Sequence, residues 1–273
     1  MSVPWWADYH LHSDNSVDCS YSMSVMARGA LQRGLREIAV TDHADFDPGD
    51  LGYGFYDYGR YRHDLDATRE AIGPTLTIRC ALELGYQAEY HDEIAAFMSG
   101  KQYDFVLGSV HFAGGQNVCD PPAWAAHVAS RLASDAYAAY FTAVAATARS
   151  GLVDVLSHLD LCKRHAISAL GPLRYADVSD LVDAALRAAV ENGVGIEINT
   201  SGLRQDPREP FPALETLRRY VELGGEWLTL GSDSHRPEHL AGGWEIAVGM
   251  AREAGVRWFA TFESRRPFLH PVP

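Results

Sequence analysis

Short apolar runs recur along the chain, and each is followed by a loop and then by a stretch with the periodicity of an amphipathic helix. Seven such runs end, in chain order, at His12, Thr41, Leu82, Val110, Ser157, Asn199 and Ser232. Near-continuous apolar segments of this length are typical of strands that are buried on both faces. Their alternation with helices predicts parallel strands joined by right-handed crossovers.

Helices are predicted at residues 22–34, 61–72, 89–98, 122–149, 179–192, 214–223 and 238–254, with a last short strand at 257–261. The longest helix carries an apolar stripe at helical spacing, which indicates a face packed on the core. The stripe consists of Tyr137, Tyr140, Phe141, Val144 and Ala148. We expect a break near Ser134-Asp135. The stretch 45–61 is rich in Gly, Asp and aromatic residues and is either a lid or an ordinary surface loop.

Seven strand–helix units favour closure into a barrel of about seven strands, similar to the TIM barrel. An open doubly wound sheet is the alternative, but such a sheet usually has a Gly-rich turn after its first strand, and none follows His12. We therefore predict an α/β chain with a single (β/α)7 barrel domain over residues 1–273. In barrels the functional residues lie at the C-terminal ends of the strands.

Composition limits the classes of function. The length of 273 residues with 47% hydrophobic residues suits one large core, and the four widely spaced cysteines indicate reduced thiols. No apolar run approaches the roughly 20 residues that span a bilayer, and the first residues lack the features of a signal peptide, so we expect a cytoplasmic location. The net charge of −13 argues against nucleic-acid or anionic membrane partners. An anionic substrate would need a locally positive site.

Polar residues that can bind metal stand at six of the seven predicted strand ends. They are His10, His12, Asp18, His43, Glu83, His111, His158, Asp233 and His235. Residues two apart on a strand face the same side, so His10 and His12 can hold one ion together. Any one of these histidines alone is better explained as an ordinary core or loop residue. Their recurrence at strand ends favours a metal site, and nine ligands suffice for three ions if one carboxylate bridges.

The remaining histidines lie on predicted helices and loops and are interpreted as solvent-facing or capping residues. They are His63, His91, His127, His165, His239 and His270.

Several motifs together resemble the polymerase and histidinol phosphatase (PHP) family, in its histidinol-phosphate phosphatase branch. They are His10-x-His12, Thr41-Asp42-His43, Leu82-Glu83, Ser109-Val110-His111-Phe112, Ser157-His158 and Gly231-Ser232-Asp233-Ser234-His235. The segments 199–204 and 208–212 also have close counterparts in that branch. The resemblance runs from the first predicted strand to the last helix.

The resemblance implies a distorted seven-stranded barrel with three divalent transition-metal ions, Zn, Mn or Fe. His10, His12, Glu83 and Asp233 would hold the first ion. Glu83, His111 and His158 would hold the second, and Asp18, His43 and His235 the third. Some members have a histidine where this chain has Asp18, and a carboxylate is a harder ligand than an imidazole, which affects the choice of metal.

Phosphate chemistry agrees with the charges of this ligand set. Three divalent ions and three carboxylates leave a site of about +3, enough to attract a phosphate dianion, and a metal-bridged hydroxide would be the nucleophile. Glu83, Asp233 and His235 are the expected catalytic residues. His235, Asp160 or a second metal-bound water would protonate the leaving alcohol, and the sequence does not choose among them.

Arginines near the same rim are candidates for holding the phosphate, because the guanidinium fork matches phosphate oxygens. Arg164, Arg204 and Arg208 are predicted to contact substrate, whereas Lys163 is interpreted as a surface residue.

The predicted activity is hydrolysis of the small-molecule monoester L-histidinol phosphate to L-histidinol and phosphate, in histidine biosynthesis. A phosphoesterase of the same family acting on nucleotides or short oligonucleotides is the alternative. A binding scaffold without catalysis is a third class, which the complete ligand set disfavours. The oligomeric state is left open.

Overall fold

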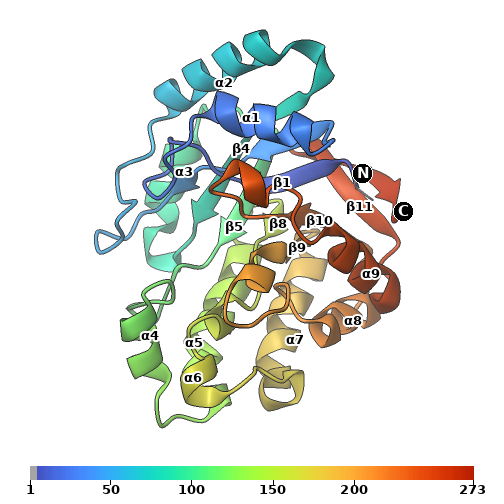
Figure 1. Cartoon of the computed structure of the whole chain (residues 1–273). Coiled ribbons are helices and arrows are strands. Elements are labelled where there is room, and N and C mark those ends of the chain that lie inside the picture. Colours follow the sequence, from blue (N-terminus) through green and yellow to red (C-terminus); the bar gives the residue numbers. More distant parts are fainter. Residues whose placement is uncertain (1–4) are drawn as a thin grey trace.

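Seven parallel strands form the centre of the computed structural model, which describes residues 5–273 (Figure 1). They are β1 (Ala7–Leu11), β2 (Glu37–Val40), β4 (Thr77–Gly85), β5 (Phe105–Ser109), β8 (Val155–Leu156), β9 (Gly195–Asn199) and β10 (Trp227–Gly231), and they pair in this order. The α/β class predicted from the sequence is confirmed.

The first and last of these strands meet just beyond the end of β10. Asp233 N donates to His10 O at 2.7 Å, and His12 N donates to Ser234 O at 2.9 Å. A single parallel bridge joins Leu11 to Ser234, in place of a regular ladder between β1 and β10. The sheet therefore curves into a distorted barrel of seven strands.

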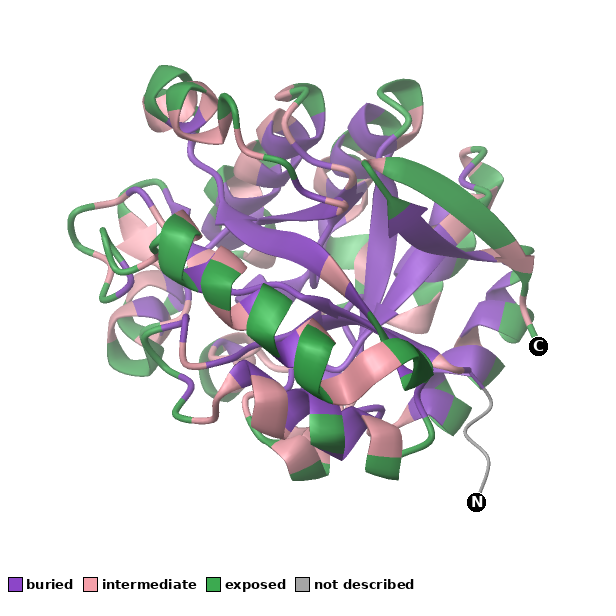
Figure 2. Cartoon of the chain, turned by 90° about the horizontal axis from the view of Figure 1, so that it is seen from above, coloured by how far each residue is buried: buried purple, intermediate pink, exposed green. Residues whose placement is uncertain are grey.

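Helices surround this barrel. They are α1 (Met23–Gln32), α2 (Tyr58–Ile72), α3 (His91–Met98), α4 (Pro121–Val128), α5 (Ala133–Arg149), α6 (Ile167–Leu170), α7 (Tyr175–Glu191), α8 (Leu214–Glu222) and α9 (Trp244–Ala254). Figure 2 shows buried strands inside a ring of helices whose outer faces are exposed. The predicted apolar stripe of α5 is buried throughout.

Several helix boundaries differ from the prediction. Helix α7 begins four residues before 179, at Tyr175, and α9 begins six residues after 238, at Trp244. The stretch 122–149 is interrupted at residues 129–132 rather than at Ser134, because Ser130 adopts a left-handed backbone conformation with φ of 61°. Helix α2 begins at Tyr58, three residues earlier than predicted, since the Asp57 side chain caps it by accepting a hydrogen bond from Arg60 N at 2.7 Å.

The end of the chain forms a hairpin that the sequence reading missed in part. The predicted strand at 257–261 is β11 (Trp258–Glu263), which pairs parallel with β10 and antiparallel with β12 (Arg266–Pro271). Phe262 N donates to the Tyr9 hydroxyl of β1 at 2.6 Å, and Ser264 N donates to Asp104 Oδ1 at 3.1 Å. The hairpin therefore lies across the N-terminal end of the barrel.

Three very short strands complete the description: β3 (His43–Ala44), which pairs with β4, and the small hairpin of β6 (Phe112–Ala113) and β7 (Gln116–Asn117). Single turns of 3-10 helix occur at Gly73–Thr75, Ala88–Tyr90, Leu161–Lys163, Thr200–Arg204 and Pro237–His239.

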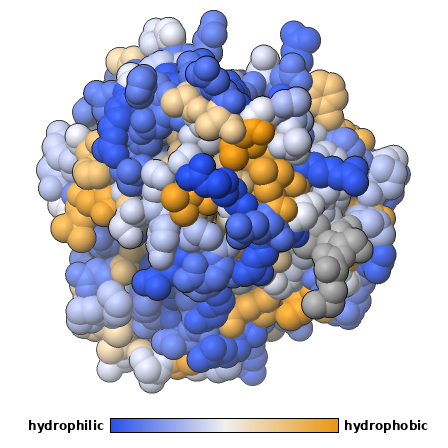
Figure 3. Space-filling view, turned by 45° about the horizontal axis from the view of Figure 1, so that its top comes forward, coloured by the Kyte–Doolittle hydropathy of each residue, from blue (hydrophilic) through white to orange (hydrophobic). Residues whose placement is uncertain are grey.

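The face in Figure 3 is mainly hydrophilic, with small apolar groups between the polar side chains. Within residues 5–273, none of the helices combines the length and the apolar character that crossing a membrane requires. The four cysteines are free thiols, as expected.

Candidate metal centre

The nine side chains predicted from the strand ends converge at the C-terminal end of the barrel, around Glu83 of β4. Glu83 Oε2 lies 3.2 Å from His10 Nε2, 3.5 Å from His12 Nε2 and 2.9 Å from His43 Nδ1. The period-two spacing of β1 turns both of its histidines to the same side, with ring centroids 5.2 Å apart.

The second oxygen of Glu83 faces a different pair of histidines. Oε1 lies 3.5 Å from His111 Nε2 and 3.1 Å from His158 Nε2, and it accepts a hydrogen bond from Ser109 Oγ at 2.5 Å. A carboxylate whose two oxygens face separate sets of imidazoles has the arrangement that bridging of two ions requires.

The outer part of the cluster is formed by Asp18, Asp233 and His235. Asp18 Oδ2 lies 3.0 Å from His235 Nε2 and 3.7 Å from His43 Nε2. Asp233 Oδ1 lies 3.4 Å from His12 Nε2 and 3.6 Å from His235 Nδ1. The side chain of Glu83 is 1% exposed and that of Asp18 is 52% exposed, so the cluster opens from the barrel interior towards solvent.

Several of these groups have a ligand atom that no hydrogen bond satisfies. His10 Nε2, His12 Nε2, His43 Nδ1 and Glu83 Oε2 are buried and have no hydrogen-bond partner among the described residues. Buried polar atoms are rarely left in this state, so the cluster suits ions that these atoms would bind. Four overlapping groups of three side chains have ligand atoms within 4.8 Å of one another and could each hold a metal ion.

The electrostatics of the cluster differ from ligand to ligand. Although burial opposes it, neighbouring carboxylates raise the pKa of His10 and His43, so these rings would release a proton when an ion binds. Burial, together with the nearby imidazoles of His235 and His43, lowers the pKa of His12 to about 3, which keeps this ring neutral. Burial alone would raise the pKa of Glu83, but the positive charges of His10 and His43 lower it well below its usual range. A neutral imidazole and an ionised carboxylate are the forms that coordinate metals.

Two carboxylates that the sequence reading did not select form hydrogen bonds to the histidines on the side away from the centre of the cluster. Glu197 of β9 accepts a hydrogen bond from His10 Nδ1 at 2.8 Å, and its other oxygen accepts from His158 N at 2.9 Å. Asp45 accepts from His111 Nδ1 at 2.9 Å. Such contacts fix the tautomer, so that the opposite ring nitrogen faces the ion.

The approach of Glu197 to His10 depends on the absence of a side chain at Gly231. A Cβ atom there would lie 1.8 Å from Glu197 Oε1 and 2.5 Å from His10 Cβ. Gly85 has the same relation to Asp45, whose Oδ1 would lie 1.9 Å from an added Cβ. Neither glycine has a positive φ, so close contact explains them rather than backbone conformation.

Replacing Glu197 with Gln is expected to lower the affinity for metal by about 10- to 100-fold, which is the usual cost of losing such a supporting contact. Glutamine keeps the size of the side chain, but its NH2 group would face one of the two donors that Glu197 accepts from, His10 Nδ1 or His158 N. Dialysis equilibrium with zinc measures the affinity, and circular dichroism checks the fold. Glu191→Gln, at the exposed end of α7, is the matched control. Equal zinc affinity in both variants would contradict the positioning role.

A cavity of about 580 Å³ opens beside the cluster. Asp18, His43, Glu83, His111, His158, Asp233 and His235 line it together with Arg164, Leu161, Asp120 and the segment from Gly49 to Leu51. The loop at 45–61 therefore supplies part of the wall. Arg164 is the only cationic side chain other than histidine among the described residues that line the cavity, and its buried Nε has no hydrogen-bond partner there.

Other side chains with predicted substrate roles lie elsewhere. Arg204 donates to Ser232 O at 2.8 Å and supports the segment that carries Asp233. Arg208 is exposed, and neither arginine lines the cavity.

The interpretation of Lys163 as a surface residue is wrong. Its side chain is 1% exposed and lies 2.8 Å from both Asp160 Oδ2 and Glu209 Oε1. A turn of 3-10 helix directs it inwards, and two carboxylates compensate its buried charge. Asp160 is occupied by this ion pair and by Ala213 N, and it does not line the cavity.

A parallel barrel with histidine and carboxylate side chains gathered at its strand ends defines a metal-binding α/β barrel. The chain belongs to the PHP domain family, whose model matches residues 8–201.

Relatives and solved structures extend this similarity over almost the whole chain. A probable histidinol-phosphatase from Deinococcus radiodurans is 29% identical, covering 95% of this chain and 97% of its own, and the histidinol-phosphatase of Lactococcus lactis is 26% identical, covering 95% of each. The crystal structure of histidinol phosphate phosphatase from Lactococcus lactis, complexed with Zn, L-histidinol and phosphate, superposes with a TM-score of 0.86 over 96% of this chain and 98% of that one, at 26% identity.

Proposed function

We propose that the chain is a histidinol-phosphatase, a phosphoric monoester hydrolase that converts L-histidinol phosphate to L-histidinol and phosphate. The observation that carries this proposal is the buried Nε of Arg164, which has no hydrogen-bond partner within residues 5–273, in a cavity beside nine metal-type ligands. The names of the relatives and the ligands of the Lactococcus lactis structure support the substrate. The cytoplasmic location and the single-domain organisation stay predictions.

The ligand set suits three divalent ions, Zn, Mn or Fe, and each proposed group has its members in proximity. The sets are His10, His12, Glu83 and Asp233; Glu83, His111 and His158; and Asp18, His43 and His235. When bound, such ions supply an activated water and neutralise charge on the phosphoryl oxygens. Glu83 would be shared by the first two sets.

The net charge of the site would be less positive than the value of about +3 obtained from three divalent ions and three carboxylates. Asp45 and Glu197 also contact the cluster, and Asp50 and Asp120 line the cavity. These carboxylates reduce the excess positive charge that three ions would provide. The guanidinium of Arg164 therefore carries a larger share of the attraction for a phosphate dianion.

Of the candidate side-chain proton donors for the leaving alcohol, His235 is better placed than Asp160. It lines the cavity, and it would supply a proton only while it is not bound to the third ion, because a coordinating imidazole nitrogen carries no proton. Asp160 lies in the Lys163 ion pair. Arg204 and Arg208 as substrate contacts stay predictions.

Arg164→Ala is expected to lower kcat/KM for histidinol phosphate by about 10- to 100-fold, because a charge-assisted contact is worth about 1.5–3 kcal/mol. Metal content should not change, since Arg164 is not a proposed ligand. Steady-state kinetics, inhibition by inorganic phosphate and elemental analysis measure the three quantities. Arg149→Ala, exposed at the end of α5, is the control. If both variants behave alike, the metals alone hold the phosphate.

The proposed function itself is tested by phosphate release from a panel of substrates. The panel contains histidinol phosphate, other small phosphomonoesters, nucleotides and short oligonucleotides. The proposal expects the highest kcat/KM for histidinol phosphate. A preference for nucleotides or oligonucleotides would support the alternative phosphoesterase, and release from none of them would support a scaffold without catalysis.

A further inference from the structure

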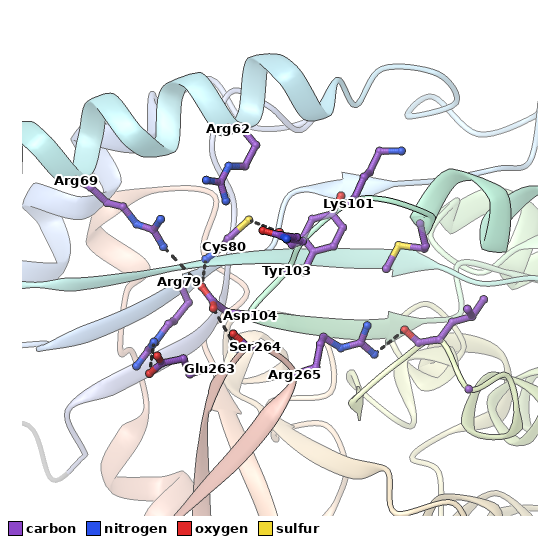
Figure 4. A pocket seen from close by; sticks show the side chains of 14 residues that line it. Arg62, Arg69, Arg79, Cys80, Lys101, Tyr103, Asp104, Glu263, Ser264 and Arg265 are labelled. Atoms are coloured by element: carbon purple, nitrogen blue, oxygen red, sulfur yellow. Dashed lines mark hydrogen bonds and ion pairs between the residues drawn. The ribbon is translucent and has the colours of Figure 1, made fainter.

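A second cavity, of about 690 Å³, lies at the opposite end of the barrel. Its walls come from α2, the start of β4, the loop before β5, the loop before β8 and the turn between β11 and β12. Figure 4 shows the guanidinium groups of Arg62 and Arg69 directed from α2 towards Cys80 and Asp104, with Arg265 on the opposite side. Nothing in the proposed phosphatase chemistry uses this cavity.

The lining of this cavity is rich in positive charge, although the whole chain carries −13. Its cationic side chains are Arg62, Arg69, Arg79, Lys101 and Arg265, and its carboxylates are Asp104 and Glu263. Gathering like charges on one surface costs free energy unless opposite charge lies close to them. It matters, therefore, which of the five cations have a carboxylate partner.

Two of the cations are fully paired and form fixed walls. Arg79 Nε lies 2.8 Å from Glu37 Oε1, and its Nη1 lies 3.1 Å from Glu263 Oε2. Arg265 donates to Asp154 Oδ2 and to Leu152 O. These contacts tie the β11–β12 turn to the barrel and leave little capacity for a further anion.

The other three cations have weaker carboxylate contacts or none: Arg62 and Arg69 have carboxylates only at 3.6–3.8 Å. The guanidinium of Arg62 is directed towards Cys80 (Figure 4), and its nearest carboxylate, that of the exposed Asp66, is 3.6 Å away. Arg69 donates to Ile78 O through both Nε and Nη2, and it lies 3.6 Å from Asp104 and 3.8 Å from Asp66.

Lys101 has no carboxylate within 4.0 Å in the part of the chain that the structure describes. Its Nζ lies over the Phe97 ring, 4.0 Å from the centroid. Lys101 also donates to Phe97 O. Three cations whose charges are only partly compensated thus border one cavity, and Arg62 is the least constrained of them.

We propose that this cavity binds a phosphate dianion, free or as the phosphate group of a small ester. Arg62 and Arg69 lie two turns apart on the same side of α2, and both guanidinium groups are directed towards the cavity (Figure 4). The fork of Arg62 is open to match the oxygens of phosphate, and Arg69 adds positive charge beside it. Tyr103 and Met98, which also line the cavity, offer an apolar surface to the organic part of an ester. The site is separate from the metal centre, because it lies at the N-terminal rather than the C-terminal ends of the strands.

The test counts phosphate sites on the metal-loaded protein by isothermal calorimetry. Inorganic phosphate and phenylphosphonate, which is not hydrolysed, are the two probes, and they distinguish a free phosphate site from an ester site. We expect two sites for at least one probe. Arg164→Ala should weaken one of them, and Arg62→Gln should weaken the other by about tenfold or more.

Matched variants separate a binding role from a structural one. Arg62→Gln should keep the kcat/KM and melting temperature of the unaltered protein, and Arg62→Lys should restore part of the second affinity. Arg252→Gln, exposed on α9, should leave both sites unchanged. A single phosphate site that only Arg164→Ala weakens, or a second site that survives Arg62→Gln, would overturn the proposal.

Discussion

Glu83→Gln is expected to abolish turnover and to lower the content of at least two metal ions per chain, while the barrel stays folded. The carboxylate of Glu83 lies within 3.5 Å of five imidazoles, through both of its oxygens. An amide presents an NH2 group in place of one of these oxygens, so one set of ligands loses its bridging anion. Elemental analysis and phosphate release on a metal-reconstituted, desalted sample measure both effects.

The control for this variant is Glu263→Gln. The side chain of Glu263 is 59% exposed and lies at the other end of the barrel from the metal centre. The substitution removes the same charge without touching the metal centre, so its metal content and activity should match the unaltered protein. The bridging role is wrong if Glu83→Gln keeps full activity. A loss of secondary structure in Glu83→Gln would instead assign it a structural role.

Removal of the metals by a chelator is expected to abolish activity and to lower the melting temperature by on the order of 10 °C or more. When the concentration of free metal is 100 times the Kd of a site, binding at that site stabilises the folded chain by about 2.7 kcal/mol. The unfolded chain cannot gather ligands from positions 10 to 235, so this stabilisation belongs to the folded state. Differential scanning calorimetry before and after chelation measures the shift.

Restoring the ions separates this effect from damage by the chelator. Addition of Zn, Mn or Fe should return both activity and melting temperature, and the amount needed for full return should approach three ions per chain. A protein that keeps full activity when elemental analysis finds less than about one ion per ten chains would contradict any role for metals in this centre.

The strand ends could be predicted from the sequence because burial on both faces makes parallel strands apolar. A polar residue directly after such a run, as at Glu83 or His158, is then informative. The alternation along β1 also predicted correctly that His10 and His12 lie close together.

The supporting carboxylates could not be found in this way. Glu197 lies inside an apolar run, where a single polar residue has no evident partner, and Asp45 begins a loop with several other aspartates. Their contacts depend on Gly231 and Gly85, whose role is visible only when neighbouring strands are placed side by side. The buried position of Lys163 was missed for a similar reason, since one of its two carboxylate partners, Glu209, is 46 residues away in sequence.

The closure of the barrel between β1 and the segment after β10 has a consequence for the order of folding. His10 and Asp233, whose backbones are hydrogen bonded, stand about 220 residues apart in the chain. The entropy of closing so long a loop must be lost before the contact forms, and long-range strand pairing is slow. The metal ligands from the two ends of the chain therefore meet late. Ions bound at this junction should slow unfolding much more than they accelerate folding.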